Sequence, residues 1–222
     1  MLHFWHSRQE PTLNPLGHPA GFVVYGVNHV IGVNFDTKEI RQAAFKLSQF
    51  GPQVRASAMG VGLKKVALQG ATVAKRAITA DYNVKSGEVA KRMHVTLDPR
   101  GLEAAIIARP RKYARGPGSN RIPLIEFSAK DTKKSGVRFK IRKAGGATTL
   151  RHAFIATMPS GHRGVFQRVP GTRKIREVVG IDVPMMFMGK RVRPAVLARI
   201  SEVGPRVILH ELAFRLSKLG FK

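Results

Sequence analysis

The 222-residue sequence contains no cysteine, so disulfide bonds and thiolate chemistry are excluded. Acidic residues are also scarce, because 13 Asp and Glu stand against 39 Lys and Arg, a formal net charge of +26. A charge of this size repels itself and favours a polyanionic partner. Nucleic acid is the commonest such partner, while an acidic membrane or protein surface, or a merely solvated basic surface, is the alternative.

Long apolar runs are missing too. No stretch reaches the roughly 18 to 20 apolar residues that a transmembrane helix needs. The N-terminal residues lack the compact apolar segment behind a basic start that marks a signal peptide. We therefore expect no membrane partner. Hydrophobic residues still make up 43% of the chain, which is enough for a core.

Catalytic and metal-binding patterns are scarce. The 13 acidic residues are spread along the chain and suggest no pair for acid–base chemistry. His210-Glu211 lacks the second histidine one turn later that a zinc site of this type requires, since position 214 is Phe. His152 and His162 flank one strand, where solvated histidines are commoner than a metal pair. The sequence therefore predicts no enzyme, no metal site and no other cofactor.

The chain divides into two parts by composition. Residues 1–26 are rich in Pro, Gly and His and nearly free of Lys and Arg, which is typical of an extended N-terminal arm. Residues 27–222 are predicted to form one α+β domain, in which N-terminal and C-terminal helices pack on a mostly antiparallel β-sheet of hairpins and a meander. The helical region spans 36–93, the sheet 93–184 and the terminal helices 188–218.

Two helical regions carry further detail. The segment from Pro52 to about Ala80 places small apolar residues on one face, which predicts a closely packed partner. Its opposite flank carries four cations, and this stripe is either a set of phosphate contacts or a solvated face. These cations are Lys64, Lys65, Lys75 and Arg76. Near the C-terminus, Gly204-Pro205 predicts a break between two helices.

Basic residues concentrate in two further segments. In residues 136–143, GVRFKIRK, apolar and basic residues alternate, so a strand here would bury one face and leave the other purely basic. Residues 108–121 are broken by Pro and Gly and predict an exposed basic loop, in which Tyr113 can stack on a base. The predicted nucleic-acid contacts are Arg111, Lys112, Arg115, Arg138, Lys140, Arg142 and Lys143. Between the two segments, residues 122–128, IPLIEFS, are predicted to form another strand.

The most distinctive segment is HAFIATMPSGHRGVFQRVPGTRK, residues 152–174. Its alternating apolar and polar residues surround a P-S-G-H turn, and with the strand-like KIREVVGIDV, residues 174–183, it predicts a three-stranded meander. Four apolar side chains are expected to hold the meander together. They are Phe154, Ile155, Val165 and Phe166.

This segment resembles the phage minor tail protein Z family and the related tail-completion proteins of long-tailed phages. The matching features are the strand Ala153-Phe154-Ile155, the turn Ser160-Gly161, the return strand Val165-Phe166-Gln167-Arg168 and the pair Val183-Pro184. The segments RPAV, KKVALQGATVAKRAI and VKSGEVAKRM are similar to the helical regions of that family. The resemblance covers residues 30–218.

The resemblance implies a structural protein of the virion tail, assembled in the host cytoplasm and placed near the head-proximal end. It implies a homo-oligomeric ring, commonly sixfold, in contact with the tail terminator, tail tube and head-closure proteins. DNA passes along the tail lumen, which agrees with the net charge of +26, and the basic segments would face that lumen. The subunit contacts would be Phe154, Phe166, Arg163, Arg168 and Arg173. The alternative is a free, sequence-independent nucleic-acid-binding protein.

Overall fold

A computed structural model describes residues 21–26, 29–34, 38–49, 51–98, 103–108, 121–132 and 136–220. The chain forms two compact units, where the sequence predicts a single domain. Unit 1 consists of residues 1–74, 93–108 and 193–222, and unit 2 consists of residues 75–92 and 109–192. Both units are assembled from segments distant in the sequence, so neither corresponds to one continuous stretch of chain.

Unit 1 contains a four-stranded sheet with the strand order β2-β1-β4-β3. Its strands are β1 (Gly21–Gly26), β2 (His29–Asn34), β3 (Met93–Leu97) and β4 (Glu103–Ala108). β1 pairs antiparallel with β2 and parallel with β4, so this sheet is mixed. Residues 21–26 therefore lie inside the sheet and not in an arm, because the run FVVY between two glycines is long enough to form a strand.

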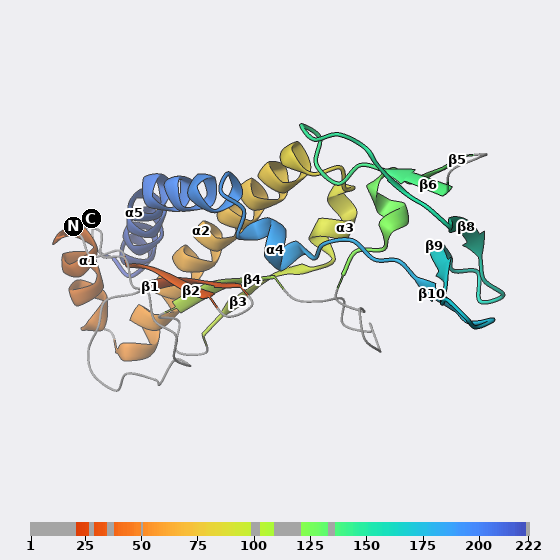
Figure 1. The fold of residues 1–222 in the computed structure, drawn as a ribbon. Coiled ribbons are helices and arrows are strands. Elements are labelled where there is room, and N and C mark those ends of the chain that lie inside the picture. The colour runs from red at the N-terminus through yellow and green to blue at the C-terminus, as the bar shows by residue number, and fades with distance from the viewer. Residues whose placement is uncertain are drawn as a thin grey trace. The chain divides into compact units, whose positions relative to one another are not determined.

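The helices of unit 1 include the best-predicted element of the chain. They are α1 (Lys38–Ser48), α2 (Pro52–Asp81), whose last turns belong to unit 2, and α5 (Val192–Lys218). The bounds of α2 differ by one residue from the predicted helix, and α2 and α5 lie side by side (Figure 1). A Cβ atom at Gly62 would lie 3.2 Å from the Cα atom of Ile208. The small apolar residues of α2 thus allow the close approach that the sequence predicts.

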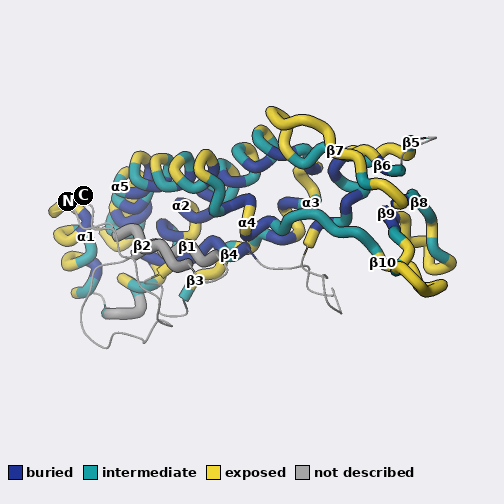
Figure 2. Tube along the Cα trace, in the orientation of Figure 1, coloured by how far each residue is buried: buried dark blue, intermediate teal, exposed yellow. Residues whose placement is uncertain are grey.

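The predicted break at Gly204-Pro205 is wrong, because α5 continues through Pro205. Proline has no backbone N–H, so the carbonyl of Ser201 loses its usual donor four residues later. Burial on both sides of the proline opposes a break, since Val203 and Ile208 are both in the core. Figure 2 shows the buried stretches along α2 and α5. Packing against the rest of unit 1 therefore outweighs the local preference of proline.

Unit 2 contains two small antiparallel sheets with strand orders β5-β6-β7 and β10-β9-β8. The first comprises β5 (Lys130–Thr132), β6 (Gly136–Phe139) and β7 (Thr148–Leu150). The second comprises β8 (Ala153–Thr157), β9 (Arg163–Arg168) and β10 (Ile175–Glu177). The second sheet confirms the predicted meander, although β10 is shorter than expected.

Short helical turns complete unit 2. They are α3 (Ser86–Ala90), the 3-10 helix η1 (Leu124–Phe127) and α4 (Val183–Phe187), which begins where the Asp182 carboxylate accepts a hydrogen bond from the Met185 N–H at 2.9 Å. The strand predicted over residues 122–128 is wrong. Leu124 and Phe127 are both buried, and this spacing of three suits a 3-10 turn. With helices and three small sheets, the fold is α+β, as predicted.

Candidate nucleic-acid interface

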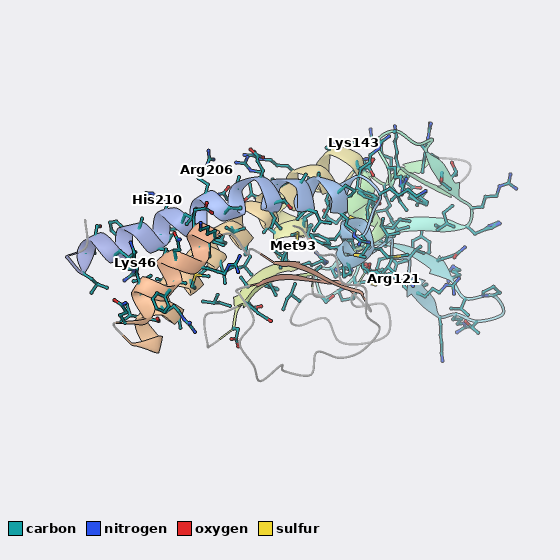
Figure 3. The ribbon with its side chains drawn as sticks, turned by 90° about the vertical axis from the view of Figure 1, so that its left-hand side faces the viewer. Lys46, Met93, Arg121, Lys143, Arg206 and His210 are labelled. Carbon is teal, nitrogen blue, oxygen red and sulfur yellow. The ribbon has the colours of Figure 1, made fainter. Side chains whose placement is uncertain are left out.

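The positive charge of the chain is concentrated in unit 2. The segments of unit 2 contain 25 Lys and Arg against 6 Asp and Glu, a formal charge of +19. Unit 1 contains 14 Lys and Arg against 7 Asp and Glu, a formal charge of +7. The excess that the composition attributes to the whole chain is therefore largely a property of one unit. Figure 3 shows nitrogen-tipped side chains projecting from the strands of this unit, with Arg121 and Lys143 labelled.

The sheet β5-β6-β7 presents one basic face. Arg138 is exposed on β6, and its neighbours in register are Lys130 on β5 and Thr149 on β7, which are exposed as well. Residues directly opposite one another share a face of the sheet. The next position, Val137, is fully buried and points to the other face. The predicted two-sided character of this strand thus holds for its first residues.

The predicted alternation does not continue to residue 142. β6 ends at Phe139, and the backbone N–H of Lys140 donates to the carbonyl of Phe127 at 3.2 Å instead of to a neighbouring strand. Arg142 turns toward Tyr82, with its Cζ atom 5.4 Å from the ring centroid and its Nη2 atom 3.4 Å from the hydroxyl. The expectation of three cations on one strand face is therefore wrong, because contacts with distant segments end the strand.

Lys143 follows in the exposed turn after β6, where its backbone N–H donates to the carbonyl of Asp81 at 2.9 Å. Its side chain makes no ion pair with any residue of the described part of the chain. Lys143 is thus available to an anion. The remaining predicted contacts, Arg111, Lys112 and Arg115, lie outside the described residues.

The meander holds its predicted apolar residues together in two cross-strand pairs. Phe154 is opposite Phe166, with ring centroids 6.3 Å apart, and Ile155 is opposite Val165. Phe166 is only 5% exposed, so this ring already packs inside the chain, whereas Phe154 is half-buried. Of the two rings predicted for a subunit contact, only Phe154 retains appreciable accessible surface.

The arginines of the meander divide between its faces. Arg163 shares a face with Val165, Gln167 and Arg176, and the Arg176 Nη2 atom lies 3.5 Å from the Gln167 side-chain oxygen. Arg168 lies on the opposite face, and Arg173 lies in the turn before β10. All of these arginines are exposed. They surround the sheet and do not form one cluster, so the structure does not bring Arg163, Arg168 and Arg173 together.

Of the two histidines of this region, His162 has an acidic partner and His152 is exposed. The His162 Nε2 atom lies 2.8 Å from a Glu177 carboxylate oxygen, and its ring packs edge-on against Phe166. His152 is exposed and has a positive φ of 59°. In the described part of the chain, no group of three His, Asp or Glu residues is arranged to hold a metal ion.

The helical residues singled out in unit 1 lie on α2 and α5. Glu211 is 6% exposed and forms an ion pair with Lys65, so this member of the predicted cationic stripe is exposed but already has an acidic partner. His210 and Arg206 are exposed, one turn apart on α5 (Figure 3). Lys64 is exposed, and no described acidic group pairs with it.

Several exposed cations were not identified from the sequence. They are Lys130, Arg151, Lys174 and Arg176. The Ser-Gly pair at 135–136 signals a turn, but a two-residue turn there would pair residue 133 with Arg138, so this signal alone does not place Lys130 opposite Arg138. Exposed cations on the surface of a sheet bind phosphates through charge and hydrogen bonding, and they do so without contacts to the bases.

Comparison of the chain with protein families, curated proteins and solved structures finds no match. Within the described residues, no helix combines the length and the apolar character that crossing a membrane requires.

Proposed function

We propose that this chain is a structural tail-completion protein of a long-tailed phage. In this proposal it forms a homo-oligomeric ring near the head-proximal end of the tail, and the basic surface of unit 2 faces DNA or an acidic neighbour. The concentration of positive charge in unit 2 carries the proposal, because a charge of this size favours a polyanion close by. The resemblance of residues 152–174 to tail-completion proteins supplies the particular setting.

The geometry of the meander supports the structural part of this proposal. Its pairs Phe154–Phe166 and Ile155–Val165 join the two strands that carry the resemblance. The half-buried Phe154 and the exposed Arg163 leave surface for contact with a neighbouring subunit. A compact hairpin with a charged border suits a repeated contact in a ring, since a ring joins the same two patches at every interface.

Imaging tests the proposal directly. Negative-stain microscopy of the purified chain should show rings, and tails assembled without the chain should be incomplete and recover when the wild-type chain is supplied. A matched variant, Phe154→Ala, should reduce ring formation, whereas Phe45→Ala, at an exposed ring on α1, should not. A strictly monomeric protein that is absent from purified virions would overturn the proposal.

The charge of unit 2 also favours a second candidate, a free protein that binds nucleic acid without sequence preference. Phosphate contacts dominate such binding, so affinity should fall steeply with salt and should not depend on DNA sequence. A titration of the free chain with DNA at several salt concentrations tests this candidate. Negligible binding at about 50 mM salt would exclude it.

A further inference from the structure

We propose that the cross-strand pair Lys130–Arg138 is a binding site for the phosphate backbone of nucleic acid. The inference rests on the proposed function and names the ligand of its basic surface, since the proposed function leaves DNA and an acidic neighbour both open. Lys130 was not a predicted contact, and only the register of β5 and β6 places it opposite Arg138.

The position of the two cations is unusual for a small sheet. Residues directly opposite on antiparallel strands have Cβ atoms about 4.5–5.5 Å apart, and like charges in this position destabilise the pairing. Both residues are exposed, and neither makes an ion pair with another described residue. Their mutual repulsion is therefore uncompensated within the described protein, and an anion between them would relieve it.

Neighbouring residues extend the site on both sides. On β7, the hydroxyl-bearing Thr149 is opposite Arg138, so Lys130, Arg138 and Thr149 form a row across the three strands. A pocket that adjoins β5 is lined by Lys130 and by Arg163 of β9, together with Asp131 and with Ile155, Ala156, Thr157 and Ala129. Asp131 is the one acidic residue of this lining, so the two cations keep a positive charge at the pocket.

The surface around the pair suits a phosphate backbone better than a protein partner. The central parts of protein interfaces are enriched in aromatic and apolar residues and depleted of lysine. The large hydrophobic side chains that are exposed in the described residues are Phe45, Leu68, Leu97, Ile175, Met185, Phe214 and Leu219. None of them belongs to β5, β6 or β7. The exposed row consists of cations and hydroxyls, which are the groups that contact phosphates.

Charge reversal at Arg138 separates binding from folding. Arg138→Glu places a carboxylate opposite Lys130 and turns a repulsive pair into an attractive one. We expect its melting temperature to equal or exceed that of the wild type. Its affinity for a short mixed-sequence DNA duplex should be about three- to tenfold weaker, and the dependence of log affinity on log salt should become shallower by about 1 to 2.

Arg206→Glu is the matched control, because it makes the same substitution and the same change in net charge at an exposed arginine of α5 in unit 1. Fluorescence anisotropy of the full chain with labelled duplex, and thermal unfolding of the same samples, give both readouts. The doubly reversed variant Lys130→Glu/Arg138→Glu restores a like-charge pair. It should melt at a lower temperature than Arg138→Glu and bind the duplex most weakly.

The outcomes are distinct. If Arg138→Glu binds DNA no more weakly than Arg206→Glu, or if it melts at a lower temperature than the wild type, the inference is wrong. The proposed function is judged separately, from rings and from the virion. If the chain forms rings and Arg138→Glu binds DNA as well as the control does, the phosphate site is wrong and the proposed function stands. A selective loss of binding in a chain that forms no rings and is absent from virions would place the site in a free nucleic-acid-binding protein.

Discussion

At the scale of single residues, the most enclosed ion pair of the described chain joins Arg92 to Glu88. The Arg92 Nη1 atom lies 2.6 Å from one Glu88 carboxylate oxygen, and the Lys91 Nζ atom lies 2.7 Å from the other. The two cations differ in burial. Arg92 is only 3% exposed, whereas Lys91 lies at the surface. Two partners of one carboxylate thus allow a buried and a surface interaction to be compared.

We expect Glu88→Gln to lower the free energy of unfolding by about 3 kcal/mol at neutral pH, because it leaves the buried Arg92 guanidinium without a countercharge. Lys91→Gln, which removes the exposed partner of the same carboxylate, should cost at most about 1 kcal/mol. Urea unfolding of the three proteins measures both changes. Equal losses in the two variants would show that burial of Arg92 does not set the strength of its pair.

Glu88 also gives the stability a pH dependence. Burial alone would raise the pKa of Glu88, but hydrogen bonds from Lys91 and Arg92 and their positive charges outweigh burial and lower it. A carboxyl group whose pKa is lowered by folding stabilises the folded state above its ordinary pKa, about 4.3, and this stabilisation is lost as pH falls through the lowered value. The stability difference between wild type and Glu88→Gln should therefore shrink below about pH 4, as urea unfolding at several pH values would show. A constant difference would contradict this assignment.

At the scale of elements, the sequence predicts best where the pattern is long and local. Small apolar residues recur without interruption through α2, and its predicted and observed bounds agree within one residue. β6 is predicted too long because its end is set by contacts with Phe127 and Tyr82, which are distant in the sequence. Lys130 was missed for a related reason, since alternation assigns a residue to a face but not to a partner on the next strand.

The same balance between local and tertiary effects explains α5. The sequence correctly identifies Pro205 as unfavourable for a helix, yet burial of Val203 and Ile208 keeps the helix continuous. A proline inside a helix costs stability through its missing donor and its clash with the preceding turn. The predicted break was therefore based on a real penalty that packing exceeds.

That penalty is measurable. Pro205→Ala should raise the free energy of unfolding by about 1–3 kcal/mol, because the new N–H can donate to the carbonyl of Ser201. Pro194→Ala is the matched control, since Pro194 lies in the first turn of α5, where backbone N–H groups have no acceptor within the helix. Its effect should stay within about 0.5 kcal/mol. If Pro205→Ala lowers stability in urea unfolding, the packing of α5 depends on the proline itself.

At the scale of the whole molecule, charge is distributed by the fold and not by sequence order. Unit 2 collects its 25 Lys and Arg from two separate segments, 75–92 and 109–192. The composition alone predicts a polyanionic partner. The division into units places most of the excess positive charge in unit 2. Since net repulsion of like charges opposes a compact state, a unit with a formal charge of +19 should gain stability from any polyanion that binds it.

We therefore expect duplex DNA to raise the melting temperature of the chain at about 50 mM salt, in proportion to its binding. A ligand at about 100 times its dissociation constant contributes about 2.7 kcal/mol to the folded state. The shift should fade as salt is raised, because screening and counterion release weaken phosphate contacts. Polyglutamate, an acidic polymer without phosphates, is the control. An equal or larger shift with polyglutamate would favour an acidic protein neighbour, and the absence of any shift with either polymer would identify the basic surface as merely solvated.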